Sequence, residues 1–313
     1  MKSKKLSFLI ALAMLFCIPS LSFAESVIEF PNEGSGGSAP QADTPDPDDK
    51  ERGDPADVTT GNLVYRYKAL SLPVKGDLPL ELTYIYRAKD HMNWGLRGDG
   101  SGRLLQLNYD TRLHFLDNGD IHRITMDLTT QLFQKMPDGS YSAQKGVHGV
   151  LKQNPDASFT YTEKDGLQFN YGSPSSFFVS SLRSIQDRNG NTITLTRRSQ
   201  PTSGPIVTDG PIFIDVVDSS GRKIELVYSG IFNTFAFKVG SQVLSIKDPA
   251  GNSTSFERDA DGNVIAITDP AGNMTTFEYY PNTRLMSKMT TPGGGIWQYE
   301  YDALGNCVKV TDP

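Results

Sequence analysis

The chain has 313 residues, of which 37% are hydrophobic and 10% aromatic, and its formal net charge is −6. A chain of this length and composition can bury the core of one large or two ordinary domains, which excludes an intrinsically disordered protein. Its acidic balance, without a basic cluster, argues against a nucleic-acid partner.

Residues 1–24 have the layout of a secretory signal peptide. A basic start precedes an apolar run over 6–18, and the small residues Ser22 and Ala24 follow at the positions a signal peptidase reads. The run is shorter than a membrane span needs. We therefore expect a cleaved signal, a secreted or cell-surface protein, and no membrane span in the mature chain. Cys307 is the only cysteine after residue 24, so no intramolecular disulfide is expected.

Residues 25–52 are predicted to be a disordered linker, because from Pro31 onward they are mostly Gly, Pro, Ser and Asp. Residues 53–180 are predicted to form an irregular β domain. Strands are expected there at 78–86, 112–116 and 159–162, separated by Asn-Gly and Asp-Gly turns. Residues 200–211 are predicted to form a loop.

Residues 181–313 are predicted to be repeats. The clearest units are 243–263, 264–284 and 285–306, with a partial unit at 307–313. Periods this short indicate stacked supersecondary units that bury their apolar faces against each other.

Each unit contains a turn written Asp-Pro-x-Gly or Thr-Pro-Gly-Gly. Asp or Thr first, Pro second and Gly fourth are the preferences of a type I turn, and the glycine accepts a positive φ. We interpret these residues as structural turn formers. They are Asp248, Pro249, Gly251, Asp269, Pro270, Gly272, Pro292 and Gly294. Looser copies stand at 187–190 and 218–221.

Apolar and polar residues alternate on both sides of every turn, which is typical of half-buried strands. Each unit therefore reads as a β-hairpin of about 20 residues. The sequence predicts an all-β protein in which repeated hairpins form a twisted, spiralling sheet.

An aromatic row recurs at one position of the repeats. It contains Phe256, Phe277 and Tyr299, with Tyr279 and Tyr301 two residues further on. The row is expected to form a ladder along one face of the sheet. An exposed ladder could bind glycans or a protein partner, whereas a buried ladder would hold the repeats together. We favour the buried ladder.

Two segments resemble the Rhs family. Glu300–Asn306, followed by a strand and Thr311-Asp312-Pro313, resembles its YD repeat, and Gly53–Asn62 resembles the opening of the domain that commonly precedes those repeats. Leu78–Leu80, Tyr84 and Tyr86, and then Asn108–Leu113, continue in the family's order, while the segment around Trp94 departs from it.

This resemblance implies a YD-repeat shell. Bacterial Rhs and wall-associated proteins, insecticidal toxin C components and teneurins build such repeats into a spiralling β-sheet, which in bacteria often encloses a C-terminal toxin. Rhs relatives can also cleave themselves with aspartates beside a D-P-x-G motif. The segment Asp248–Gly251 echoes that spelling, but we interpret it as the ordinary turn of the repeat.

The histidines are His91, His114, His122 and His148, and none belongs to an H-E-x-x-H motif. His114 and His122 flank a turn and could face each other across a hairpin as a metal pair. We favour two ordinary strand residues.

Other candidate sites also have structural interpretations. Gly98–Gly102 lacks the strand-to-helix setting of a phosphate loop, and Asp259–Asn263 is too short for a calcium loop. Cys307 is expected to pack rather than react. The sequence predicts no catalytic residue, no metal, no cofactor and no enzyme activity.

The function expected from the sequence is that of an exported structural repeat protein. It would form part of an Rhs-type shell that holds or presents another polypeptide. The alternative is a cell-surface adhesion module. The expected partner is accordingly an encapsulated or associated polypeptide, or else a cell-surface glycan.

Overall fold

The computed structural model describes residues 56–57, 61–72, 78–89, 107–175, 179–198, 211–229 and 242–313. The chain divides into residues 1–46 and 47–313, and every described residue belongs to the second unit. The expected signal peptide, linker and Gly98–Gly102 loop, together with Trp94, His91 and residues 200–210, lie outside the described residues. Within the part that is described, no helix is both long and apolar enough to cross a membrane.

Antiparallel strands make up just over half of the described residues and nearly all of their regular secondary structure, which confirms the all-β prediction. The first strands are β1 (Ala56–Asp57), β2 (Asn62–Leu72) and β3 (Leu80–Arg87), which form one sheet. β2 and β3 are the two arms of a long hairpin, in which Tyr65 lies opposite Tyr86 and Tyr67 opposite Tyr84. A 3-10 helix, η1 (Asn108–Asp110), follows.

The next strands form short hairpins. They are β4 (Arg112–Phe115), β5 (Ile121–Ile124), β6 (Thr130–Lys135), β7 (Tyr141–Ala143), β8 (Val150–Gln153), β9 (Phe159–Thr162), β10 (Gln168–Tyr171) and β11 (Val179–Gln186). The strands expected at 78–86, 112–116 and 159–162 correspond to β3, β4 and β9.

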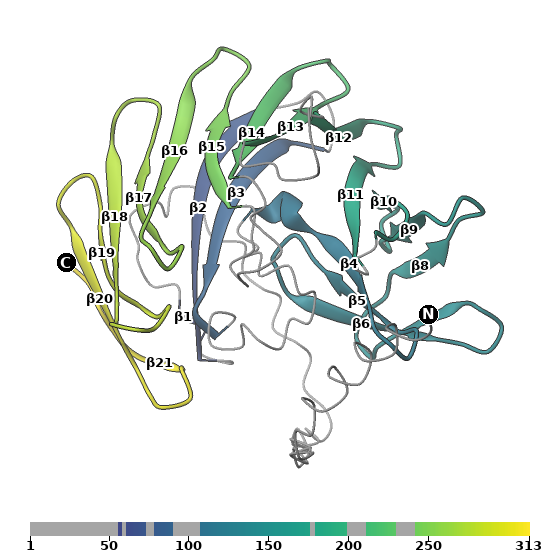
Figure 1. Ribbon diagram of the computed structural model, residues 1–313, viewed down its shortest axis with the longest axis horizontal. Coiled ribbons are helices and arrows are strands. Elements are labelled where there is room, and N and C mark those ends of the chain that lie inside the picture. Colours follow the sequence, from purple (N-terminus) through teal and green to yellow (C-terminus); the bar gives the residue numbers. More distant parts are fainter. Residues whose placement is uncertain are drawn as a thin grey trace, which may run out of the picture. The chain divides into compact units, whose positions relative to one another are not determined.

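The remaining strands follow one another in a single ladder, each pairing with the next. They are β12 (Thr192–Arg198), β13 (Ile212–Val217), β14 (Lys223–Tyr228), β15 (Val243–Lys247), β16 (Ser253–Arg258), β17 (Val264–Thr268), β18 (Met274–Tyr279), β19 (Met286–Thr290), β20 (Ile296–Tyr301) and β21 (Cys307–Thr311). Figure 1 shows these hairpins side by side. The predicted repeated hairpins are thereby confirmed.

Strand β11 connects this ladder to the preceding strands. Its first residues, Val179 to Ser181, pair with β4, while Ser184 to Gln186 pair with β12 on one side and β10 on the other. The backbone ladder therefore runs across residue 181. The domain boundary placed there remains a prediction.

The turns of the repeats share one geometry. The amide of Gly272 donates to the carbonyl of Asp269 at 3.0 Å, and the amide of Asp269 donates to the carbonyl of Asn273 at 2.9 Å. Gly272 has a φ of +85°, the left-handed conformation that glycine adopts without a steric penalty. A type I turn followed by such a residue closes hairpins with the twist that a sheet requires.

One hydrophobic core contains residues from the N-terminal hairpin, from β4 to β11, and from the repeats. A second, smaller cluster joins Val64 and Ile85 of the hairpin to Ile124 and Leu128. Figure 1 shows β2 and β3 lying along the hairpins of the repeat ladder. The long hairpin is therefore part of the repeats' core.

Candidate functional site

The aromatic row of the repeats is buried. Phe256, Phe277 and Tyr299 are exposed to 4%, 3% and 0% of their surface. They come from β16, β18 and β20, which are alternate strands of the ladder and so lie about 9.5 Å apart. Rings at that spacing cannot stack directly on one another. Another group must fill the intervals between them.

Tyrosines of the N-terminal hairpin contact the row. The ring of Tyr65 meets that of Phe277 edge-on, with a centroid distance of 5.3 Å, and Tyr84 lies 5.6 Å from Phe256. Tyr86 lies 6.2 Å from Tyr279. Aromatic pairs at such distances stabilise beyond the area they bury. The β2–β3 hairpin thus lies with its tyrosine face on the repeats.

Burial makes these phenols hard to ionise. Loss of solvent raises the pKa of Tyr84 to about 12 and raises the pKa values of Tyr86 and Tyr279 well above the usual value. All three therefore stay protonated at any physiological pH. They serve as neutral packing groups and hydrogen-bonding hydroxyls rather than as acids or bases.

Hydrogen bonds to the backbone fix the hairpin in register with the repeats. The amide of Met286 donates to the Tyr86 hydroxyl at 2.8 Å, and that hydroxyl donates to the carbonyl of Arg284 at 2.9 Å. The amide of Cys307 donates to the carbonyl of Gly61 at 2.7 Å. These contacts reach three successive units of the repeat, the last of them the partial unit at 307–313.

In each of three repeat hairpins, a long polar side chain on the second strand donates a hydrogen bond to a backbone carbonyl at the start of the first strand. The hydroxyl of Tyr279 donates to the carbonyl of Val264 at 2.7 Å, and that of Tyr301 donates to the carbonyl of Met286 at 2.9 Å. Arg258 holds the same place one unit earlier and donates to the carbonyl of Val243 at 2.9 Å. Each of the three residues follows a register shift in its strand. The first letter of the YD motif therefore has a structural role here.

The turn aspartates are also committed to structural bonds. The Asp269 carboxylate accepts from the amides of Ala271 and Asn273 and from the side-chain amide of Asn273, each at 2.8 Å. The hydrogen bond from the Asn273 side chain leads the causes that lower the pKa of Asp269. Asp302 and Asn306 repeat the arrangement. The Asn that follows the glycine in the D-x-x-G-N turns, such as Asn273 and Asn306, is a partner that our sequence analysis missed, although that spelling is visible.

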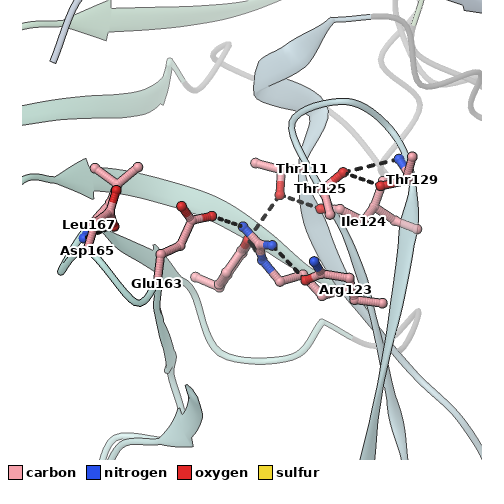
Figure 2. A network of polar contacts seen from close by, with 10 residues as sticks. Thr111, Arg123, Ile124, Thr125, Thr129, Glu163, Asp165 and Leu167 are labelled. Carbon is pink, nitrogen blue, oxygen red and sulfur yellow. Dashed lines mark hydrogen bonds and ion pairs between the residues drawn. The ribbon is translucent and has the colours of Figure 1, made fainter. Parts of the chain in front are cut away.

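A buried arginine organises the strands before the repeats, as Figure 2 shows. Arg123 is 1% exposed, and its guanidinium lies 3.7 Å from the ring centre of Tyr161 and 4.6 Å from that of Phe169. It donates to the Tyr171 hydroxyl at 3.1 Å and to Gln131 at 2.9 Å, while the Glu163 carboxylate lies 3.9 Å away. Nothing in our sequence analysis singled out Arg123.

A recess of about 400 Å³ lies beside η1. Leu78, Met126 and Leu167 contribute apolar surface, and Glu81, Asp165 and Asp187 contribute carboxylates. Each of the three carboxylates accepts a hydrogen bond from another residue of the chain. These carboxylates therefore already serve structural bonds.

The structure brings one pair of the candidate reactive residues together. His114 and His122 are direct partners across the β4–β5 hairpin. His148 is exposed, and Cys307 is half-buried at the start of β21. Within the described residues, no group of three or more His, Cys, Asp or Glu side chains could hold a metal ion. Among the predicted site residues, those of the aromatic row make the most extensive set of contacts, and they make these contacts with the N-terminal hairpin.

Comparison with known proteins identifies the repeats. Residues 239–274, 258–296 and 279–313 match the family model for the RHS Repeat. A search of curated proteins finds no match.

Solved structures similar to the chain include a Photorhabdus luminescens Tc holotoxin pore carrying TccC3-D651A. It is 13% identical over 77% of this chain and 16% of that chain, with a TM-score of 0.17. The TcdB2–TccC3 complex is 13% identical over 74% of this chain and 17% of that chain, with a TM-score of 0.16. The chain thus spans about a sixth of these proteins, and the assignment of the repeats depends on the family model.

Proposed function

Residues 239–313 consist of Rhs repeats, and from this premise we propose that the protein is an exported structural scaffold whose repeat sheet holds or presents another polypeptide. The resemblance to Rhs proteins makes a toxin-associated polypeptide the expected cargo. The proposed role requires no catalysis. The aspartates of the repeat turns are occupied by hydrogen bonds within their own turns.

The observation that supports this proposal is the packing of the N-terminal hairpin against the repeat sheet. The repeat sheet already holds one extended polypeptide segment, through the rings of Phe256 and Phe277 and through backbone groups of Arg284 and Met286. Ring contacts tolerate many apolar sequences. The backbone hydrogen bond from the Cys307 amide to the Gly61 carbonyl does not depend on side-chain sequence, whereas the bonds of Arg284 and Met286 require the Tyr86 hydroxyl. A face with both properties suits a holder of polypeptide segments.

A trans-binding experiment tests the holding function. In a Tyr84→Ala/Tyr86→Ala variant the cis hairpin should detach from the face, because two of its ring contacts are removed. This variant should bind a fluorescent peptide of residues 62–87 at least tenfold more tightly than the wild-type chain does. A control peptide with Ser in place of Tyr65, Tyr84 and Tyr86 should not bind. If the variant is folded but does not bind the native peptide, the proposal that the repeat sheet holds polypeptide segments is refuted.

Export is tested separately. Mature protein recovered from the exporting cell should begin at Glu25, and mass spectrometry of the N-terminus checks this. An intact Met1 in the membrane fraction would contradict export without bearing on the holding face.

Among the described residues, no observation favours the glycan-binding alternative. The rings of Phe256 and Phe277 pack against the N-terminal hairpin, and Tyr299 is also buried. They cannot act as a carbohydrate platform while the hairpin is seated.

A further inference from the structure

His114 and His122 are cross-strand partners, as the turn between them dictates. They lie directly opposite each other in the β4–β5 hairpin, and both are half-buried. Side chains directly opposite in an antiparallel pair have Cβ atoms about 4.5–5.5 Å apart and share one face of the sheet. Two imidazoles so placed can converge on one ion at metal–nitrogen distances of about 2.0–2.1 Å.

We propose that His114 and His122 form a two-histidine site for a divalent transition-metal ion such as Zn²⁺ or Ni²⁺. This inference is independent of the scaffold function. It also departs from the expectation that the chain has no metal site.

The fold fixes the register of the pair. The turn between the strands is closed by the amide of Leu116, which donates to the carbonyl of Asp120 at 2.9 Å. Next to the histidines, Leu113 and Arg123 face the core and are exposed to 0% and 1%. A slip of one residue would move these side chains to the opposite face of the hairpin, so the two imidazoles are held together on the face opposite to Leu113 and Arg123.

Both histidines also lie away from a sheet edge. β4 is flanked by β11, where Val179 lies opposite His114, and β5 is flanked by β6, where Leu132 lies opposite His122. Strands held on both sides fix the backbone of each ligand. Folding therefore already orders the backbone of both ligands, so metal binding loses little further conformational entropy.

The donor set defines the class of metal. Imidazole nitrogen suits zinc, copper and nickel, whereas magnesium and calcium prefer oxygen. No third His, Cys, Asp or Glu completes the set among the described residues. Water would take the remaining positions, and the expected affinity is below that of a closed structural zinc site.

Calorimetric titration of the mature full-length chain with Ni²⁺ and Zn²⁺ at pH 7.5 tests the site. The wild-type chain should bind one ion, and Mg²⁺ should give no heat. His114→Gln and His122→Gln should each weaken binding at least tenfold, whereas His148→Gln, at an exposed histidine, should leave it unchanged. Binding that survives the His114→Gln/His122→Gln double variant would overturn the proposal, as would absence of binding to the wild-type chain.

A second measurement needs no variant and so does not depend on how well a variant folds. Diethyl pyrocarbonate modifies neutral imidazoles, and mass spectrometry locates each modification. Zn²⁺ should protect His114 and His122 but leave His148 reactive. Equal modification of all three with and without the metal would contradict the site.

Discussion

The hydroxyl of Tyr86 accepts a hydrogen bond from the amide of Met286 at 2.8 Å, between residues that are 200 positions apart. The same hydroxyl donates to the carbonyl of Arg284 at 2.9 Å. Tyr86 is 1% exposed and Met286 is 0% exposed. One phenol thus satisfies two backbone groups of the repeat sheet, one of which belongs to the fully buried Met286.

Tyr86→Phe should destabilise the protein by about 1–3 kcal/mol, because it leaves the buried amide of Met286 without its acceptor. The ring and its contact with Tyr279 are retained, so the loss measures the hydroxyl alone. Urea unfolding gives the free energy. Tyr65→Phe removes a hydroxyl from the same face of the hairpin and should cost less. An equal cost for both variants would contradict the bridging role of Tyr86.

Phe277→Ala should cost about 3–5 kcal/mol, because the ring is 3% exposed and packs against Tyr65. Met274→Ala is the matched control, since Met274 lies on the same strand but is 47% exposed. The control should change the free energy of unfolding by less than about 0.5 kcal/mol. Denaturant melts compare the two, and a midpoint unaffected by Phe277→Ala would refute a buried row.

Two adjacent glycines in one turn isolate the effect of backbone conformation, because neither would be crowded by an added Cβ and only one has a positive φ. Gly294 has a φ of +84°, Gly293 has no positive φ, and an added Cβ would meet nothing within 4 Å at either residue. Gly294→Ala should therefore cost about 1–2 kcal/mol from conformation alone. Gly293→Ala should be neutral or should stabilise by up to about 1 kcal/mol. Thermal melts of the two variants would contradict this account if Gly293→Ala were the more damaging.

Acid should weaken the repeats through their turn aspartates. Hydrogen bonds from Asn273 lower the pKa of Asp269, and those from Asn306 lower the pKa of Asp302. A carboxyl whose pKa is lower in the folded state stabilises fully above its unfolded pKa of about 3.9 and stops doing so as the pH falls through the folded pKa.

Urea melts between pH 2.5 and 6 measure this dependence. The free energy of unfolding should fall below about pH 4, and it should fall less steeply in Asp269→Asn, which has no proton to gain at that position. Carboxyl carbon NMR gives the titration of Asp269 directly. A titration at or above the ordinary value would contradict the role of Asn273.

The sequence predicts the hairpins and their turns because the information is local. Five residues such as Asp269–Asn273 contain the whole turn, and alternation of apolar residues sets the buried face of the strands beside it. The register of His114 with His122 is also local, because the turn between them fixes it. Features of this kind can be read from one stretch of sequence.

The partners of the aromatic row cannot be predicted in the same way. Tyr84 and Tyr86 alternate along the strand predicted at 78–86, which indicates a buried face but not what that face touches, and the strand that contains Tyr65 was not predicted. Their contacts lie almost 200 residues away, and no periodicity links the two segments. The burial of Arg123 has one local signal in the sequence. Arg123 stands two residues after the apolar Ile121, so the two side chains lie on the same face of the strand.

Arg123 provides the last prediction, since its surroundings suggest that neutral partners matter more than its ion pair. Two rings enclose the guanidinium, and Tyr171 and Gln131 accept its hydrogen bonds at 3.1 and 2.9 Å. Glu163 lies at 3.9 Å with its side chain 37% exposed, so solvent screens the ion pair.

Arg123→Met keeps an unbranched stem between the rings but removes every donor, and it should cost about 2–4 kcal/mol through lost cation–π contacts and unsatisfied acceptors. Glu163→Gln should cost less than about 1 kcal/mol, because an exposed and distant carboxylate contributes little. Urea melts of the two variants and of their combination give the coupling between the residues. If Glu163→Gln costs as much as Arg123→Met, the ion pair rather than the rings holds these strands together.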